Sequence, residues 1–238
     1  LAAITADLSA AQTTAVAQIA TAQAITTTAA AALSAEGVNA LSPATVSALS
    51  PDAVASLTTA AVGSLDAAQV AAITTAQAAG ITSSQVDALS TTQIAAITPS
   101  TLGALSPAAV TSLSTAQVAA ITPAQAGAIT AGQVDLLSTT QLAALTPAAV
   151  AGLSAAALGS LDATQTAAIT ATQVDALTTT QLAAITPAAV AGLSATAIGS
   201  LDAAQVGALT VAQLDALSPA QIKLIAPTAL AGLSAEGL

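Results

Sequence analysis

The sequence predicts an all-α solenoid, a superhelix in which each eight-residue repeat contributes one very short helix of about five or six residues. Three observations lead to this prediction. Leu or Ile recurs at every eighth residue from Ile25 to Leu233. Ser, Thr or Asp follows it in every repeat except one, which has Ala226. All nine prolines and ten of the thirteen glycines occupy fixed places in the repeat. We call the repeat an octad and number its positions from the Leu or Ile; its consensus is L-[ST]-x-x-Q-V-x-A.

Each octad position has a role that suits one end of a helix. Position two carries a typical N-cap residue, and every proline lies at position three, where it would be the first helical residue. Position five is Gln in 14 octads and completes a capping box, while positions one and six form a hydrophobic staple. The Gly or Ala at positions seven and eight is expected to end the helix. We therefore expect helices to begin at position three and turns to span positions eight to two.

Two other periodic structures fit this pattern poorly. In one continuous helix the octad pattern would rotate by about 80° per repeat and leave no apolar stripe, and interior prolines would break the helix. In a β-solenoid, positions one and six would lie on opposite faces, and Ala, Pro, Gln and Asp are poor strand residues. Helices this short are unstable alone, so we expect collective stability and a thin aliphatic core without a pocket.

The repeats define the domain organisation. We expect residues 1–24 to form irregular N-terminal repeats, out of phase by one residue, and residues 25–238 to form one continuous octapeptide-repeat solenoid. Within it, five octads make a 40-residue super-repeat that is clearest in residues 129–238. Because the consensus persists to the last residues, we also expect the chain to be part of a longer array.

The composition argues against most biochemical activities. The chain has no Cys, His or aromatic residue, one basic residue (Lys223) and eleven acidic residues, for a net charge of -10. These absences exclude disulfides and Cys-ligated zinc, remove the commonest general base, and make nucleic acid a poor partner. No window of about 20 apolar residues exists, so we expect no membrane span. We predict that the protein is not an enzyme and has no catalytic, cofactor-binding or firm metal-binding residue.

Seven of the eleven acidic residues fall into two groups with different expectations. One group occupies position two, where Asp is an ordinary helix cap: Asp66, Asp162 and Asp202. The other group occupies position seven, near the helix end, where the helix dipole does not favour a negative charge: Asp87, Asp135, Asp175 and Asp215. If the superhelix aligned this second group, it would form an acidic stripe that binds calcium. A calcium site needs about six to eight oxygen ligands, so a plain solvated face is the favoured interpretation.

The octads "LSTTQLAALTPAAVAGLS" at residues 137–154 resemble the Ala/Thr-rich octapeptide-repeat regions of giant bacterial secreted and cell-surface proteins of the adhesin-like kind. The resemblance is one of composition and extends over nearly the whole chain. It implies an extracellular or cell-surface location and a role as stalk, fibre or surface coat.

Three functions remain open on the sequence. The first is a structural protein, a rod, filament or surface-coat segment that self-associates into a polymer or continues into further repeats. The second is a solenoid binding module, an adhesin stalk that engages a protein or glycan. Binding solenoids usually expose aromatic or charged residues, which are scarce here, so the structural role is favoured. The third is an ice- or surface-binding protein, which would need the position-two threonines to point outward rather than cap helices.

Overall fold

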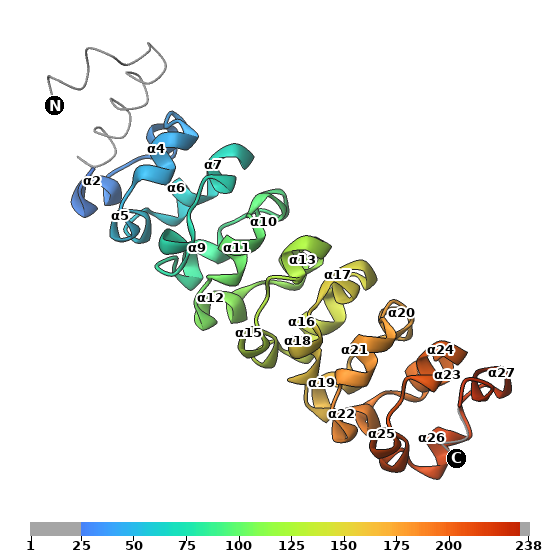
Figure 1. Cartoon of the computed structure of the whole chain (residues 1–238). Helices are drawn as coiled ribbons and strands as arrows, with labels where there is room; N and C mark the ends of the chain where they lie inside the picture. The colour runs from blue at the N-terminus through green and yellow to red at the C-terminus, as the bar shows by residue number, and fades with distance from the viewer. Residues whose placement is uncertain (1–24, 234–238) are drawn as a thin grey trace, which may run out of the picture. The chain divides into compact units, whose positions relative to one another are not determined.

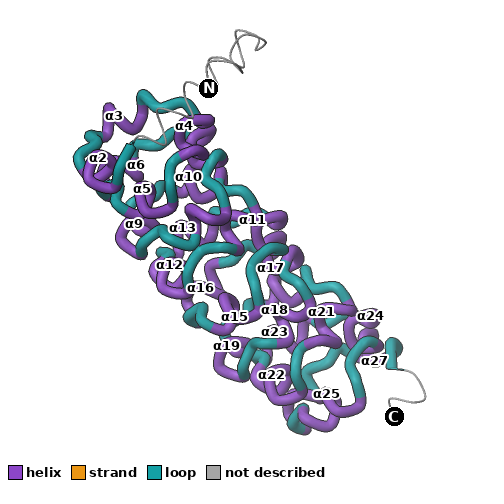
Figure 2. The backbone as a smooth tube through the Cα atoms, turned by 60° about the vertical axis from the view of Figure 1, so that its left-hand side comes forward, coloured by secondary structure: helices purple, strands orange, loops and turns teal. Residues whose placement is uncertain are grey.

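The computed structural model of the chain describes residues 25–233. They belong to two compact units, Leu1–Ser112 and Leu113–Leu238. The described part contains 26 short helices and no strand (Figures 1 and 2). The prediction of an all-α fold built from one short helix per octad is therefore confirmed. The expected irregular repeats at residues 1–24 lie outside the described residues.

The described part of the first unit has eleven helices. They are α2 (Thr27–Ala31), α3 (Ala35–Asn39), α4 (Pro43–Ala48), α5 (Pro51–Ala55), α6 (Thr59–Gly63), α7 (Ala67–Ala71), α8 (Thr75–Ala78), α9 (Ser83–Asp87), α10 (Thr91–Ala96), α11 (Pro99–Gly103) and α12 (Pro107–Ser112).

The described part of the second unit has fifteen. They are α13 (Thr115–Ala119), α14 (Pro123–Ala126), α15 (Ala131–Asp135), α16 (Thr139–Ala144), α17 (Pro147–Gly152), α18 (Ala155–Gly159), α19 (Ala163–Ala167), α20 (Ala171–Asp175), α21 (Thr179–Ala184), α22 (Pro187–Gly192), α23 (Ala195–Ser200), α24 (Ala203–Gly207), α25 (Val211–Ala216), α26 (Pro219–Ile222) and α27 (Pro227–Leu230).

Every described helix begins at octad position three, as predicted, because the cap at position two sets its start. In α10 the N-cap Ser90 is extended (φ −72°, ψ 162°), and its hydroxyl accepts the backbone N–H of Gln93. In α17 the N-cap is Thr146, and Pro147 is the first helical residue. The exception at position two, Ala226, makes no side-chain cap, yet α27 still begins at the next residue, Pro227. Local capping and proline geometry thus place the helix starts.

Most described helices end at position seven or eight, as predicted, but they do not end through a left-handed glycine. No described glycine has a positive φ, so none adopts the left-handed conformation by which glycine ends many helices. The helices end instead with a residue that is still right-handed, such as Ala72 (φ −82°, ψ −9°), or with an extended position-one residue, such as Leu145 (φ −58°, ψ 136°). The periodic glycines instead lie where the backbones of consecutive turns approach closely.

Successive octads wind into a solenoid with three octads in each turn. In the first unit α4 packs against α7 and α7 against α10; in the second, α16 packs against α19, α19 against α22 and α22 against α25 (Figure 1). Within each unit, each helix therefore meets the helix three octads further along. Because an octad holds one helix, a solenoid turn has three octads, or 24 residues.

The core is a narrow column of aliphatic side chains in each unit. Position one supplies Leu145, which is 3% exposed, and position six supplies Ile94, which is fully buried. The predicted burial of positions one and six is confirmed across the interior turns. No described helix is both long and apolar enough to cross a membrane.

Candidate functional site

The most distinctive buried group in this chain is the side chain at position five. Position-five glutamines are buried against the aliphatic core in all described octads that have them except the one containing Gln221, which is half-buried. The buried ones are Gln69, Gln77, Gln85, Gln93, Gln117, Gln125, Gln133, Gln141, Gln165, Gln173, Gln181, Gln205 and Gln213. A buried amide is costly unless its donors and acceptor are hydrogen-bonded. No buried side-chain polar atom of the described residues lacks a partner.

Gln69 shows how one amide satisfies two helix ends. Its Oε1 accepts the backbone N–H of the N-cap Asp66 at 2.8 Å, and the Asp66 carboxylate accepts the N–H of Gln69 at 2.7 Å. Its Nε2 donates to the carbonyl oxygens of Val38 (3.0 Å) and Leu41 (2.6 Å) in the preceding turn. Val38 lies near the end of α3, where the carbonyls lack full helical partners, and Leu41 lies in the turn that follows, so the glutamine hydrogen-bonds to both. We call this arrangement the glutamine bridge.

The bridge recurs with a constant register. The Nε2 of Gln173 donates to Leu142 at 2.9 Å and to Leu145 at 2.7 Å. These acceptors lie 31 and 28 residues earlier in the chain, which are the sequence separations that Gln69 also has. The acceptors are thus position six of the fourth octad back and position one of the third octad back. The bridge therefore both connects consecutive turns and fits a turn of three octads.

Sequence reasoning accounts for only half of this role. The predicted capping box explains Oε1, and it is present in α7, α10 and α20 among other helices. The Nε2 contact with the preceding turn is the part that it missed. The sequence feature that could have indicated the Nε2 contact is that position five has 14 glutamines and no glutamate. Either residue completes a capping box, but only the amide can also donate hydrogen bonds.

Position eight makes a second line of contact between turns. It faces the position-three carbonyl of the preceding turn: the Ser64 hydroxyl donates to Ala35 at 2.9 Å and the Ser160 hydroxyl to Ala131 at 3.1 Å. Where this position is glycine, the backbones come closer still. A Cβ on Gly152 would lie 2.9 Å from the Cα of Pro123. Small residues at position eight therefore let consecutive turns approach closely.

The acidic residues at position two are helix caps. Asp66, Asp162 and Asp202 are the N-caps of α7, α19 and α24, and the carboxylate of each accepts the backbone N–H of the glutamine three residues later. Glu36 and Asp52 lie in the first turns of α3 and α5, where the positive end of the helix dipole favours a negative charge.

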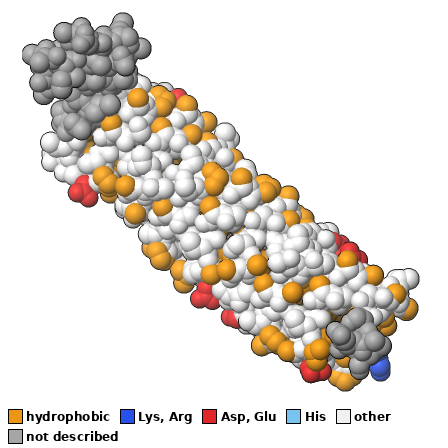
Figure 3. All heavy atoms as spheres, viewed as in Figure 1, with side chains coloured by type: hydrophobic (Ala, Val, Ile, Leu, Met, Phe, Trp, Pro, Cys, Tyr) orange, Lys and Arg blue, Asp and Glu red, His pale blue; other side chains and the backbone are white. Residues whose placement is uncertain are grey.

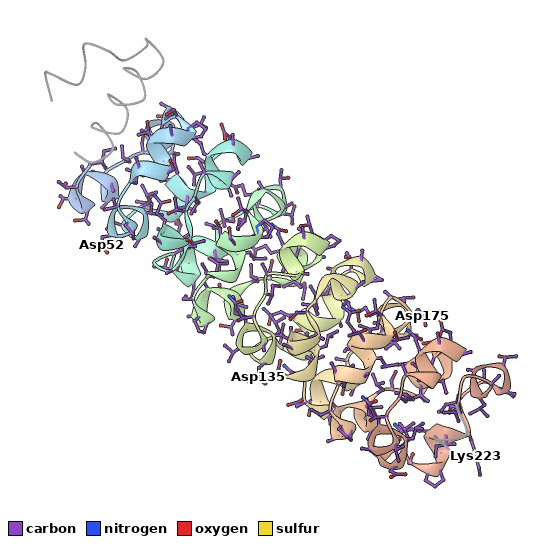
Figure 4. All side chains as sticks on the ribbon, in the orientation of Figure 1. Asp52, Asp135, Asp175 and Lys223 are labelled. Atoms are coloured by element: carbon purple, nitrogen blue, oxygen red, sulfur yellow. The ribbon has the colours of Figure 1, made fainter. Side chains whose placement is uncertain are left out.

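The acidic residues at position seven do not form the aligned stripe that calcium binding would need. Asp87, Asp135 and Asp175 end α9, α15 and α20, and Asp215 lies in α25. Within the second unit, successive residues of this group are five octads apart, and five is not a multiple of the three octads in a turn. Consequently Asp135 and Asp175 lie on different sides of the solenoid (Figure 4). No three carboxylates in the described residues gather where they could hold a metal ion.

The remaining surface carries few charges. Figure 3 shows isolated acidic side chains and scattered apolar ones on the visible face of each unit. Lys223, the only basic residue of the chain, is exposed just after α26 (Figure 4). The largest exposed apolar side chains include Val211 (58% exposed) and Leu136 (44%).

Comparison with known proteins finds a family match over a short part of the chain. Residues 94–131 match the family described as the ALTTAQ repeat. Neither the search of curated proteins nor the search of solved structures found a match. The family match and the regular packing of the octads together show a repeat protein with a helical, solenoid-like fold.

Proposed function

We propose that this chain is a secreted or surface-exposed structural segment, a rod, filament or coat built from octapeptide repeats, and that it is not an enzyme. One observation carries the proposal. Each turn contacts the next through the same small set of contacts: the glutamine bridge, the position-eight contact and the aliphatic column. Such an interface lets an array lengthen without new chemistry, which suits a spacer or fibre.

The composition and the resemblance support the same role. A chain without Cys, His or aromatic residues has few groups for catalysis. The octads are similar to repeat regions of giant bacterial secreted and adhesin-like proteins, which supports an extracellular or cell-surface location. The composition and the resemblance indicate a class of protein and do not identify a partner.

We further propose that the array self-associates end to end or continues into further repeats. Interior position-six side chains of the described octads, such as Val110, are at most 5% exposed. In the last described turn, Ile222 is 43% exposed and Leu230 is 38% exposed at the same position. A following turn would cover these side chains, and its burial of apolar area would favour association.

Sedimentation of the chain over a range of concentrations tests the self-association. We expect the mean mass to rise with concentration, and we expect filaments in negative-stain electron microscopy. The variant Ile222→Asp/Leu230→Asp should suppress both, because it places charge on the proposed contact. Val211→Asp, on a position-three side chain that is already exposed, is the matched control and should leave association unchanged. A monomer at all concentrations would reject self-association.

A further inference from the structure

The glutamine bridges are distributed unevenly along the second unit. Three octads with Gln at position five, such as those of Gln165, Gln173 and Gln181, alternate with two octads that have Ala there. The Ala-type pairs cover residues 145–160 and 185–200. Each five-octad super-repeat in this part of the chain therefore contains three bridges and a gap of two octads.

The Ala-type octads are joined to the preceding turn by few side-chain hydrogen bonds. In residues 145–160 the only one is from the Ser160 hydroxyl to Ala131 at 3.1 Å. In residues 185–200 the Ser200 hydroxyl donates to Ala171 at 3.5 Å, and the buried Thr166 hydroxyl donates to Ala189 at 2.6 Å. By contrast, Gln165 alone donates to three carbonyls of the preceding turn, at 3.0 to 3.2 Å. The gaps are therefore the seams with the fewest side-chain hydrogen bonds between consecutive turns, although the backbones approach closely there at Gly152 and Gly192.

The length of a gap matters because a solenoid turn has three octads. A gap of two octads always leaves at least one glutamine bridge in every turn that includes it. A gap of three octads would leave one complete turn attached to its predecessor without any bridge. In a solenoid, the coupling between neighbouring units determines whether the array unfolds as one body or in parts.

We propose that a two-octad gap is the longest that keeps the turns of the second unit coupled, and that the glutamine pattern sets where the solenoid breaks. The bridge acts as a coupling device: it makes consecutive turns open together, and removing one bridge beside a gap uncouples the array at that place. A bridge inside a run of glutamine octads can be lost without uncoupling the turns, because a neighbouring glutamine still connects each turn to the preceding one.

Two neighbouring glutamines of the second unit give a matched test in the full chain. Gln165→Ala joins octads 145–152, 153–160 and 161–168 into one turn without a bridge. Gln173→Ala removes a bridge whose hydrogen bonds, 2.7 and 2.9 Å, are shorter than those of Gln165, yet every turn that includes its octad keeps Gln165 or Gln181. Both side chains are at most 6% exposed, so both variants remove a buried amide.

The readout is segment-resolved native-state hydrogen exchange. We compare the protection of α14–α16 with that of α17–α19, the consecutive turns that are bridged by Gln165 alone. We expect Gln173→Ala to lower both together and leave their ratio as in the parent chain. We expect Gln165→Ala to change the ratio by about tenfold or more, because the two segments then open separately.

The proposal is overturned if Gln165→Ala changes the ratio no more than Gln173→Ala does. If the alanine variants fold too poorly to compare, Gln165→Leu and Gln173→Leu replace them. Leucine fills most of the space of the buried amide while removing its hydrogen bonds, which avoids the cavity that alanine leaves. The same difference between the two sites is expected for this pair.

Discussion

At the residue scale, the position-five glutamine combines two requirements that a capping glutamate could meet only in part. Gln85 accepts the N–H of Thr82 at 2.9 Å and donates to the carbonyls of Val54 and Leu57, both at 2.9 Å. The acceptor half follows from the local pattern and is predictable. The donor half depends on which backbone lies beside the helix in the preceding turn, so the octad alone does not encode it.

Replacing this amide by a carboxylate tests the donor half. In Gln85→Glu the capping contact with Thr82 can persist, but an ionised carboxylate would face two carbonyl oxygens. We expect a loss of about 2–4 kcal/mol in the free energy of unfolding, more than for Gln85→Ala, measured by urea denaturation at pH 7. Burial raises the pKa of the introduced carboxyl, so this loss should shrink as the pH falls from that raised pKa toward about 4.3, and it should change little at lower pH, where the folded and unfolded chains are both protonated. Equal losses for the two variants would contradict the donor role.

Glycine provides a second test at this scale. A Cβ on Gly192 would overlap the Ala163 carbonyl and lie 2.7 Å from the Thr166 hydroxyl, so Gly192→Ala should cost about 1–3 kcal/mol. A Cβ on Gly132, inside α15, would have no neighbouring atom within 4 Å, and Gly132→Ala should stabilise by about 0.5–1 kcal/mol. Thermal unfolding of both variants gives the comparison. If both substitutions stabilised the protein, close approach would not be the reason for Gly192.

At the element scale, the helix starts were predictable because they depend on neighbouring residues. Position two caps, position three begins the helix, and proline occurs only where its missing N–H costs nothing. The helix ends were not predictable in the same way. The expected glycine terminators keep ordinary backbone angles, as Gly127 shows with φ −61° and ψ −21°. These glycines lie where consecutive turns approach closely, and such a tertiary contact cannot be predicted from the capping pattern.

Two aspartates at opposite helix ends test the capping account. Asp162 accepts the N–H of Gln165 at 2.7 Å as the N-cap of α19, so Asp162→Ala should cost about 1 kcal/mol. Asp135 is the last residue of α15, where the helix dipole opposes a negative charge. Asp135→Ala should therefore be neutral or stabilise by a few tenths of a kcal/mol. Denaturation midpoints at low salt measure both changes, and a larger cost at Asp135 would contradict this account.

At the scale of the whole molecule, the number of octads in a solenoid turn could not be predicted. The eight-residue period predicts where each helix begins, but it does not predict how far the chain rotates from one helix to the next. The 40-residue super-repeat gives no help, because five octads do not fit a turn of three. For the same reason Asp135 and Asp175 were candidates for one stripe in the sequence and lie on different sides of the second unit.

Collective stability is the remaining expectation at this scale, and Leu145→Asp tests it. Leu145 is 3% exposed, and its carbonyl accepts the bridge from Gln173, so the substitution places a charge inside the column between two turns. A buried charge without a partner should cost about 4 kcal/mol or more, and hydrogen exchange should show lost protection in several neighbouring turns. Leu136→Asp is the matched control: Leu136 is 44% exposed, so its replacement should change protection little. Loss confined to α16 and α17 in Leu145→Asp would mean that each turn is stable on its own, contrary to the marginal stability expected of helices this short.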